Sequence, residues 1–348
     1  MKKQTIYNYS EDELRDIISD MGYAAFRAEQ IIDGLYSKYA ASFRDIQTLP
    51  KQLRSQLENK FVIDPLHPEE ISTSQDGTRK LLFRLGDDSF IESVIILERN
   101  DKFTLCLSTQ AGCMLDCAFC ATGKLPFRRN LQSGEIIAQY LSAQRLTNDQ
   151  VSNIVYMGMG EPLLNYPNVI KSLKMLIEGK TKMIGKKRIT LSTVGVLPQM
   201  KDLRKDNPGI KLALSLHATT DKQREEIIPV ARKWSIKELQ EELLKYYQEN
   251  KDAITFEYIL FKDFNDSDND VVRLTRISRA FPSKINIIAY HQSDIIKDTG
   301  LVPADNSEIK IFADKLKENG VNVFLRDSSG KDINAACGQL ALSIERKF

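Results

Sequence analysis

Apolar and polar positions change their spacing twice along the chain, and each change marks a different kind of structure. In the first sixty residues apolar side chains recur at intervals of three and four, which is one face of a helix. Ser10 and Glu13 form a capping-box pair that predicts where the first helix begins. Further helices are expected over residues 25–39 and from Pro50 onward. Residues 1–75 are therefore predicted to form a small helical domain.

Residues 76–104 show a second pattern, in which short runs of strand-forming residues are separated by turns. Glycine, asparagine and aspartate dominate the two connectors, at 86–88 and 99–101, and these residues favour tight reversals of the chain. We expect a β-meander that links the helical domain to the rest of the chain. Its strands are predicted at residues 80–85, 90–97 and 103–107.

From residue 105 to residue 348 short apolar runs alternate with amphipathic segments. This order predicts an α/β domain in which parallel strands are joined by crossover helices. Strands are expected at residues 153–157, 188–192, 211–215, 254–260, 284–289 and 321–325. Helices are expected at residues 134–146, 167–177, 197–205, 236–249, 268–281 and 307–319. Such repeats suit either a doubly wound sheet or a complete or partial barrel, and in a barrel the chemistry lies at the carboxyl ends of the strands.

The composition is that of an ordinary globular protein, with 42% apolar and 28% charged residues among 348. No run approaches the roughly 18 to 20 apolar residues that a membrane span needs. Lys2 and Lys3 are not followed by the apolar stretch of a secretory signal. We therefore expect a cytoplasmic protein without membrane contact.

Charge is unevenly distributed, although the net charge is only +2. Residues 171–205 hold ten basic side chains and only two acidic ones. Such an excess favours a phosphate-rich ligand, and a solvated lysine-rich face is an equally good interpretation. The basic residues are Lys171, Lys174, Lys180, Lys182, Lys186, Lys187, Arg188, Lys201, Arg204 and Lys205. Lys124, Arg128 and Arg129 are candidates for the same phosphate-contacting role.

Four of the five cysteines lie within fifteen positions, which is a poor framework for disulfides and is typical of metal or redox chemistry. Cys113, Cys117 and Cys120 have the spacing C-x3-C-x2-C. Three thiolates on one loop can bind three corners of a 4Fe–4S cluster, and the fourth iron then stays open to a ligand. The alternative is a zinc site with Cys337 as a fourth ligand.

A glycine-rich segment, residues 157–162, directly follows an apolar strand. Its glycines let the backbone approach a ligand closely, and the carboxylate of Glu161 could pair with an ammonium group. With the cysteine spacing, and with Phe119 just before the last cysteine, this segment resembles the radical S-adenosylmethionine (SAM) superfamily. Members of that superfamily place such a segment against the amino group of SAM.

The resemblance narrows to the RlmN/Cfr family of radical SAM RNA methyltransferases, and within it to the RlmN branch. Its motifs are CLSTQAGC at 106–113, CATG at 120–123, MGMGEPLLN at 157–165, LST at 191–193, LSLH at 214–217 and AACGQL at 335–340. The similarity extends over nearly the whole chain. It implies a partial (β/α)6-type radical SAM barrel over residues 105–348, with residues 1–75 as an RNA-binding-like accessory domain.

The resemblance also implies a reaction. RlmN-type enzymes methylate C2 of an adenine in 23S rRNA, at the peptidyl transferase centre, and in tRNA, next to the anticodon. Two SAM molecules serve each turnover: one methylates Cys337, and the second, bound at the open iron, yields a radical that takes a hydrogen from the S-methyl group. The carbon radical adds to the adenine and Glu92 accepts the ring proton. Cys106 then releases the product through a transient disulfide with Cys337.

Cofactor contacts and partners follow from the same resemblance. The implied SAM contacts are Gly160, Glu161, Ser192, Ser215, Leu216, His217 and His291. The family commonly has asparagine where this chain has His291, and an imidazole can also make one such hydrogen bond. The expected partners are 23S rRNA, tRNA and a flavodoxin-type electron donor, and no DNA. The alternatives are a Cfr-like adenine-C8 methyltransferase that confers antibiotic resistance and a zinc-containing RNA-binding protein without catalysis.

Overall fold

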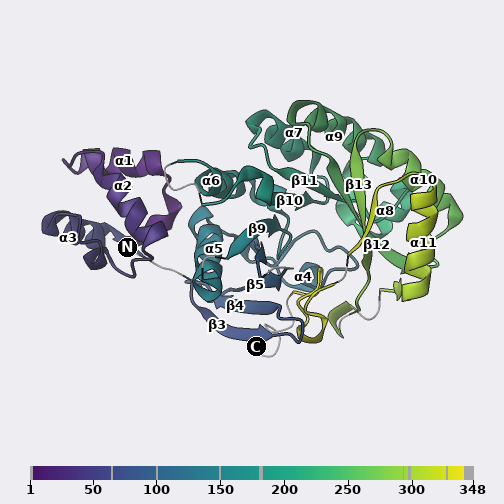
Figure 1. The fold of residues 1–348 in the computed structure, drawn as a ribbon, viewed down its shortest axis with the longest axis horizontal. Coiled ribbons are helices and arrows are strands. Elements are labelled where there is room, and N and C mark those ends of the chain that lie inside the picture. Colours follow the sequence, from purple (N-terminus) through teal and green to yellow (C-terminus); the bar gives the residue numbers. More distant parts are fainter. Residues whose placement is uncertain are drawn as a thin grey trace.

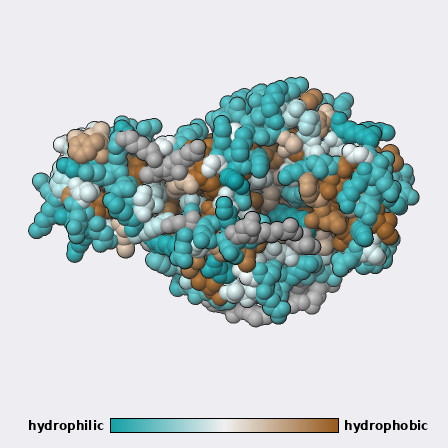
Figure 2. All heavy atoms as spheres, in the orientation of Figure 1, coloured by the Kyte–Doolittle hydropathy of each residue, from teal (hydrophilic) through white to brown (hydrophobic). Residues whose placement is uncertain are grey.

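A computed structural model of the chain describes residues 3–63, 66–98, 101–148, 150–179, 183–292, 294–296, 299–326 and 328–340. An N-terminal helical unit, a group of antiparallel strands and an α/β body follow one another along the longest axis of the molecule (Figure 1). In a space-filling view the helical unit projects from the body, and most of the visible surface is hydrophilic (Figure 2). Among the described residues no helix has the length and apolar character needed to cross a membrane.

Three α-helices form the N-terminal unit, namely α1 (Glu11–Asp20), α2 (Arg27–Ile32) and α3 (Lys51–Lys60). The predicted capping box is present, because the Ser10 hydroxyl accepts from the Glu13 amide and the Ser10 amide donates to the Glu13 carboxylate at 2.7 Å. The predicted second helix is α2 continued by a π-helical turn, Asp33–Ser37. The short parallel strands β1 (Gln4–Thr5) and β2 (Phe61–Val62) bring the two ends of the unit together.

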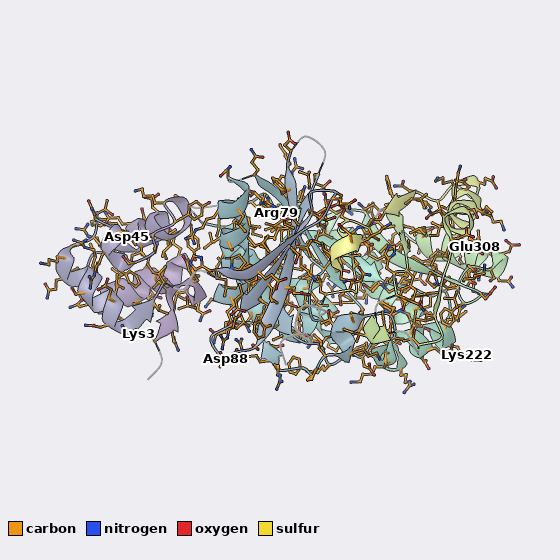
Figure 3. The ribbon with its side chains drawn as sticks, turned by 90° about the horizontal axis from the view of Figure 1, so that it is seen from below. Lys3, Asp45, Arg79, Asp88, Lys222 and Glu308 are labelled. Atoms are coloured by element: carbon orange, nitrogen blue, oxygen red, sulfur yellow. The ribbon has the colours of Figure 1, made fainter. Side chains whose placement is uncertain are left out.

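Antiparallel strands connect this unit to the body. The predicted meander strands are β4 (Arg79–Arg84), β5 (Phe90–Leu97) and β6 (Phe103–Cys106). An additional strand, β3 (Pro68–Thr73), pairs with β4. It lies within the predicted helical domain 1–75, so the helical elements end well before the boundary drawn at residue 75. The turn between β4 and β5 carries Asp88, which Figure 3 shows between the helical unit and the body.

The body is the expected alternation of parallel strands and helices. From β6 the parallel strands continue in the spatial order β9 (Val151–Tyr156), β10 (Ile189–Thr193), β11 (Lys211–Ser215), β12 (Ile254–Lys262), β13 (Ser283–Ala289) and β15 (Val323–Arg326). The connecting helices include α5 (Ser133–Thr147), α6 (Tyr166–Ile177), α7 (Leu197–Asp206), α9 (Ile236–Asn250), α10 (Asp268–Ser278) and α11 (Asn306–Glu318). Several short elements were not predicted, among them α8 (Asp221–Ile227) and β14 (Val302–Pro303), which pairs with β12.

The parallel strands curl into a partial barrel. Four strands separate β15 from β9 in the sheet order, yet Arg326 at the end of β15 lies 3.6 Å from the sulfur of Met157, the residue after β9. A flat doubly wound sheet would hold these residues several strand spacings of about 4.8 Å apart. The contact therefore decides between the two architectures left open by the sequence, and it confirms the partial (β/α)6-type barrel.

Candidate active site

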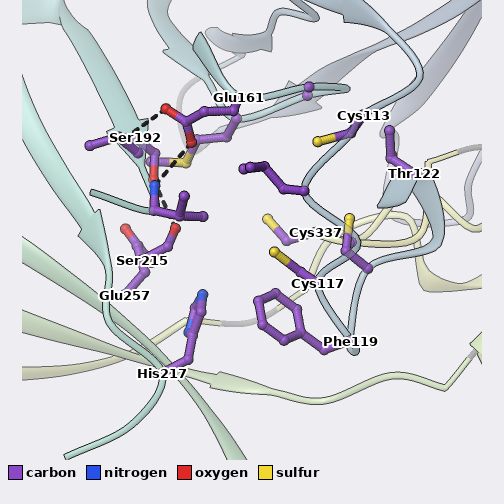
Figure 4. A pocket seen from close by; sticks show the side chains of 18 of the residues that line it. Cys113, Cys117, Phe119, Thr122, Glu161, Ser192, Ser215, His217, Glu257 and Cys337 are labelled. Carbon is purple, nitrogen blue, oxygen red and sulfur yellow. Dashed lines mark hydrogen bonds between the residues drawn. The ribbon is translucent and has the colours of Figure 1, made fainter. Parts of the chain in front are cut away.

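A cavity opens at the carboxyl ends of the parallel strands. Cys113, Cys117 and Cys120, on the loop after β6, line one side together with Cys337. In the close-up, the sulfur atoms of Cys113, Cys117 and Cys337 face a space bounded opposite by side chains from the barrel strands (Figure 4). The labelled residues on that opposite side are Glu161, Ser192, Ser215, His217 and Glu257.

The three cysteines of the loop have the properties of ligands that need a cation. Burial raises the pKa of Cys113 to about 12, and burial with repulsion from the neighbouring thiols also raises the pKa of Cys117 well above its usual value. Bound iron would stabilise the thiolates that the apolar surroundings disfavour. Among the described residues no three His, Cys, Asp or Glu side chains converge on one metal ion. In a 4Fe–4S cluster each thiolate binds a different iron, so wider spacing is expected there.

Glu161 is held in place by three hydrogen bonds. Its Oε1 accepts from the amide of Leu163 at 3.0 Å and from the hydroxyl of Thr193 at 2.7 Å, and its Oε2 accepts from the amide of Val194 at 3.0 Å. Burial raises the pKa of this carboxyl although the hydrogen bonds oppose the shift. A carboxylate has about four acceptor positions, so capacity remains for a ligand ammonium. Thr193 has a positioning role that sequence reasoning did not find.

The glycines of residues 157–162 are required by close packing against the chain after β6. A Cβ on Gly158 would lie 2.7 Å from the carbonyl oxygen of Leu107. Gly160 has φ +91°, and a Cβ there would lie 2.4 Å from the Cβ of Gln110. The sequence interpretation assigned these glycines to close approach of a ligand. In the structure these glycines let residues 157–162 pack closely against Leu107 and Gln110, which precede the cluster loop. This packing places Glu161 in the cavity wall.

Barrel residues complete the opposite wall. The hydroxyls of Ser192 and Ser215 lie 3.3 Å apart at the ends of β10 and β11. The buried ring of His217 packs edge-on against Phe119 at 4.7 Å, and its Nδ1 accepts from the amide of Ile259 at 3.0 Å. Burial lowers the pKa of His217 to about 3, so the ring is neutral and carries its proton on Nε2. A bound ligand would therefore meet a hydrogen-bond donor at this position.

Two residues of the predicted SAM set do not line the cavity. Leu216 is buried between Ser215 and His217, and its amide donates to the carbonyl of Glu257 at 3.0 Å. His291 lies just after β13, and burial with the charge of Lys331 lowers its pKa. Its Nε2 is a buried atom without a hydrogen-bond partner among the described residues. Contacts of these residues with SAM remain predictions.

Cys106 and Glu92 lie on one face of the sheet. Val94 pairs with both Cys106 and Lys80, and cross-strand partners share a face. Glu92, two residues before Val94, has the same orientation. The Lys80 ammonium is 3.3 Å from the Glu92 carboxylate, and both side chains are buried. Neither Glu92 nor Cys106 is among the cavity-lining residues.

Cys337 lies on a loop that docks against both the cluster loop and the turn between β3 and β4. The Ala121 amide donates to the carbonyl of Gly338 at 2.7 Å, which fixes the loop beside Cys120. On the other side, the amide of Gly330 donates to Asp76 at 2.9 Å and Asp332 accepts from the Gln75 amide at 3.2 Å. Cys337 is exposed, and all five cysteines are free thiols. The expected Cys106–Cys337 disulfide is therefore not present in this structure.

Comparisons with known proteins agree with this site. Residues 107–275 match the model of the radical SAM superfamily, and residues 4–63 match that of the ribosomal RNA large subunit methyltransferase N-terminal domain. A probable dual-specificity RNA methyltransferase RlmN of Pseudothermotoga lettingae is 41% identical over 93% of this chain and 94% of that protein. The chain belongs to the RlmN family. The dual-specificity RNA methyltransferase RlmN of Pelobacter propionicus is 37% identical over 97% of this chain and 96% of its own length.

The structural comparison extends over the same length. A radical SAM methyltransferase from Sphaerobacter thermophilus superposes with a TM-score of 0.90 at 35% identity, over 97% of this chain and 98% of that one. As an RlmN family member the chain is a radical SAM RNA methyltransferase, which excludes the non-catalytic zinc protein. Membership also implies a 4Fe–4S cluster and SAM. The cysteines that fit the cluster are Cys113, Cys117 and Cys120.

The described basic residues of the segment 171–205 in this RlmN family member do not line the cavity. Lys187 and Arg188 precede β10, at the amino end of the strand, whereas Ser192 near its carboxyl end lines the cavity. Several of the cations are also neutralised, as in the pairs of Lys171 with Glu13 and of Arg204 with Glu242, both at 2.7 Å. Lys180 and Lys182 lie outside the described residues. Contact between this segment and RNA remains a prediction.

Sequence reasoning missed two arginines at the site, the buried Arg224 and the half-buried Arg326. The Arg224 guanidinium donates to the carbonyls of Ser215 at 3.1 Å and Leu216 at 3.2 Å, and also to that of Val194. It therefore ties the ends of β10 and β11 together beneath the cavity. Arg326 lines the cavity itself. Their positions depend on how the strands curl, and no local motif marks either residue.

Proposed function

We propose that this chain methylates C2 of an adenine in both 23S rRNA and tRNA through an S-methylcysteine at Cys337. The observation that carries the proposal is the position of Cys337, a fourth thiol that lines the same cavity as the three cluster cysteines. Relatives that match nearly the whole chain are described as dual-specificity RNA methyltransferases. A radical SAM enzyme that used only the cluster loop would have no need of a thiol at this position.

The residues of the chain have separate tasks in this proposal. Cys113, Cys117 and Cys120 hold the 4Fe–4S cluster, and Glu161, Ser192, Ser215 and His217 hold SAM. When bound, the cluster and a second SAM supply one-electron chemistry at the S-methyl group. An adenine C2 is an electron-poor carbon that does not attack a methyl donor directly, and this is why such chemistry is needed. The electron comes from an external donor of the flavodoxin type.

Glu92 and Cys106 act after the carbon–carbon bond forms. Glu92 accepts the ring proton, and the ammonium of its partner Lys80 lies 3.3 Å from the carboxylate. Cys106 attacks the sulfur of Cys337 to release the product and leaves a disulfide, which a reductant must open before the next turnover. The target base must leave its stack to reach Cys337, so looped or unpaired RNA is the preferred substrate.

Replacement of Cys106 by alanine tests the proposal. Without Cys106 the thioether between Cys337 and adenine should form but not break, so a covalent protein–RNA species should accumulate in a denaturing gel after incubation with SAM and reductant. Cys337→Ala is the matched control and should give neither adduct nor product. Normal turnover by Cys106→Ala, or an adduct with Cys337→Ala, would contradict the assignment.

A further inference from the structure

The loop that carries Cys337 lies against the start of β4. A Cβ on Gly330, near the beginning of this loop, would lie 3.0 Å from Cγ2 of Thr78. Four residues further along, the backbone carbonyl of Asn334 accepts from the ammonium of Lys80 at 3.5 Å. Thr78 and Lys80 are two residues apart, so their side chains point to the same side of the extended chain. The loop therefore covers the face of the sheet to which Lys80 points.

The same ammonium is paired with the carboxylate of Glu92. The Nζ of Lys80 lies 3.3 Å from Oε1 of Glu92, and the two side chains are 4% and 0% exposed. Lys80 on β4 stands opposite Val94 on β5, so Glu92 is its diagonal neighbour and within reach of a long side chain. An ammonium has three N–H donors. Lys80 can therefore hold the Glu92 carboxylate and the Asn334 carbonyl at the same time.

The main chain of Glu92 is fixed by a separate set of contacts. Its carbonyl accepts from the hydroxyl of Ser108, and its amide lies 3.2 Å from the sulfur of Met159. The hydroxyl of Ser108 also accepts from the amide of Met159 at 2.8 Å. These contacts involve only the backbone of Glu92. The carboxylate is therefore oriented by contacts of its own, and the pair with Lys80 is one of them.

Stability alone does not account for a lysine and a glutamate buried on neighbouring strands. Desolvation of the two charges offsets most of their attraction, and apolar residues of similar volume in place of a buried ion pair often leave a protein equally stable or more stable. The contact with the loop gives this pair a role that an apolar replacement could not fill, because only a donor can hold the Asn334 carbonyl.

We propose that Lys80 is a positioning residue that couples the proton acceptor Glu92 to the loop carrying Cys337. The proposal rests on the proposed function. In the step concerned, adenine is joined to Cys337 through the transferred carbon, and the C2–H bond of the ring breaks. The proton goes to a carboxylate oxygen of Glu92, and the electron pair of the broken bond stays on the adduct. A proton acceptor acts only within hydrogen-bond reach, about 2.6–3.2 Å, and one ammonium in contact with both partners sets that distance.

The test compares two products of one reaction mixture. Lys80→Met keeps the length of the side chain and removes its charge and donors. Cluster-loaded protein is incubated with SAM, reductant and 23S rRNA, and 5′-deoxyadenosine, which reports SAM cleavage, is quantified beside 2-methyladenosine. Because a displacement of about 1 Å can cost about a hundredfold in rate, Lys80→Met should lower the ratio of 2-methyladenosine to 5′-deoxyadenosine by about ten- to a hundredfold. S-methylation of Cys337 should continue.

The ratio separates positioning from general damage, because a variant that is merely misfolded loses both products together. Glu92→Gln gives the reference value for a site without its proton acceptor. Lys102→Met removes an exposed lysine directly before β6 and is the matched control, so it should leave the ratio at the wild-type value.

Hydrogen exchange in the absence of SAM and RNA supplies a second readout. Residues 330–336 should exchange faster in Lys80→Met, because the contact with the Asn334 carbonyl is lost, and Lys102→Met should show no change. An unchanged ratio in folded Lys80→Met overturns the proposal, and a lowered ratio with unaltered exchange overturns the coupling to the loop. If Lys80→Met does not fold, Lys80→Gln, which keeps a donor and loses the charge, must show the same loss in the ratio.

Failure of the proposed function would give a different result. Wild-type protein would then form no methyladenosine in 23S rRNA or tRNA, which would reject the reaction and with it the part of Lys80 in proton transfer. The exchange measurement needs no turnover, so it would still show whether Lys80 holds the Cys337 loop.

Discussion

At the scale of single residues, the cluster loop brings together one buried and two half-buried thiols, a combination that a metal site explains well. Each thiol of Cys113, Cys117 and Cys120 has a raised pKa because burial disfavours its charged form. These thiols line the same cavity as Glu161, Ser192 and Ser215. A cluster bound to the thiols would therefore lie next to the residues that are proposed to hold SAM.

Loss of any one of these thiols should therefore prevent cluster assembly. Anaerobic reconstitution of the wild type should give about four irons and four labile sulfides per chain, since three cysteines suit a cube with one open iron. Cys113→Ala, Cys117→Ala and Cys120→Ala should each lose most of the iron and the broad visible absorbance. Cys337→Ala is the matched control and should keep them. Stoichiometric zinc without sulfide in the wild type would contradict the assignment.

The parts of the site that could be predicted are those whose residues lie together in a short sequence motif. The cysteine spacing, the glycine-rich segment and the residues at the ends of β10 and β11 all occur in short runs, so the sequence alone grouped them. Arg326 and Glu257 were missed because their contact exists only once β15 and β12 lie in one curled sheet. The close approach that requires Gly158 was assigned to a ligand, because the sequence does not reveal that the carbonyl of Leu107 lies there.

At the scale of elements, the turn between β3 and β4 supports the loop that carries Cys337. Asp76 accepts from the amides of Thr78 and Gly330, each at 2.9 Å. Burial opposes ionisation of Asp76, but these hydrogen bonds outweigh it and lower the pKa to about 2. The antiparallel strands therefore not only link two domains. Through the turn between β3 and β4 they also position the Cys337 loop at the cavity.

Asp76→Ala should release this loop. We expect faster hydrogen exchange over residues 328–340 and a loss of about 1–2 kcal/mol in the free energy of unfolding, because two hydrogen bonds to a charged acceptor disappear. Asp314→Ala, which removes an exposed carboxylate from α11, should change neither measurement. Unaltered exchange in Asp76→Ala would show that other contacts hold the loop.

The hydrogen bonds to Asp76 also make the stability of the protein depend on pH. A carboxyl with a lowered pKa contributes stability above its unfolded pKa, and the contribution is lost as the pH falls toward the folded value. The contribution of Asp76 to stability should be complete down to about pH 4, near the ordinary pKa of aspartate. It should then decline as the pH falls toward 2.

Most elements were predictable because apolar strands and amphipathic helices have distinct periods. The strand β3 was missed because its sequence, Pro-Glu-Glu-Ile-Ser-Thr, has no apolar face, and its residues are largely exposed at the edge of the sheet. Edge strands often carry such charges and prolines. The short helix α8 lies inside the connection between β11 and β12 and has too few residues for a periodic pattern.

At the scale of the whole molecule, the N-terminal unit is attached to the body at the start of α5. Asn8 accepts from the Gly134 amide at 2.9 Å and donates to Gln132 at 2.7 Å. A Cβ on Gly134 would lie 2.8 Å from backbone atoms of Tyr7 and Asn8, so the two parts meet backbone to backbone. This attachment fixes where the N-terminal unit lies relative to the cavity.

Gly134→Ala should weaken the attachment. In a helix, alanine is normally more stabilising than glycine by up to about 1 kcal/mol. Here the added Cβ would be overpacked, so the substitution should instead lower the free energy of unfolding by about 1–3 kcal/mol. A lower melting temperature and a larger radius of gyration in solution scattering are expected. Gly185→Ala is the control, since its nearest atom would be 3.9 Å away and little should change. A stabilised, equally compact Gly134→Ala would contradict the packing argument.

The central claim is that this cavity directs methylation to C2 of adenine through Cys337. The most direct measurement is mass-spectrometric mapping of methyladenosine isomers in 23S rRNA and tRNA after incubation with cluster-loaded protein, SAM and reductant. The account predicts 2-methyladenosine in both RNAs with the wild type and none with Cys337→Ala. Formation of 8-methyladenosine, or of 2-methyladenosine by Cys337→Ala, would contradict it.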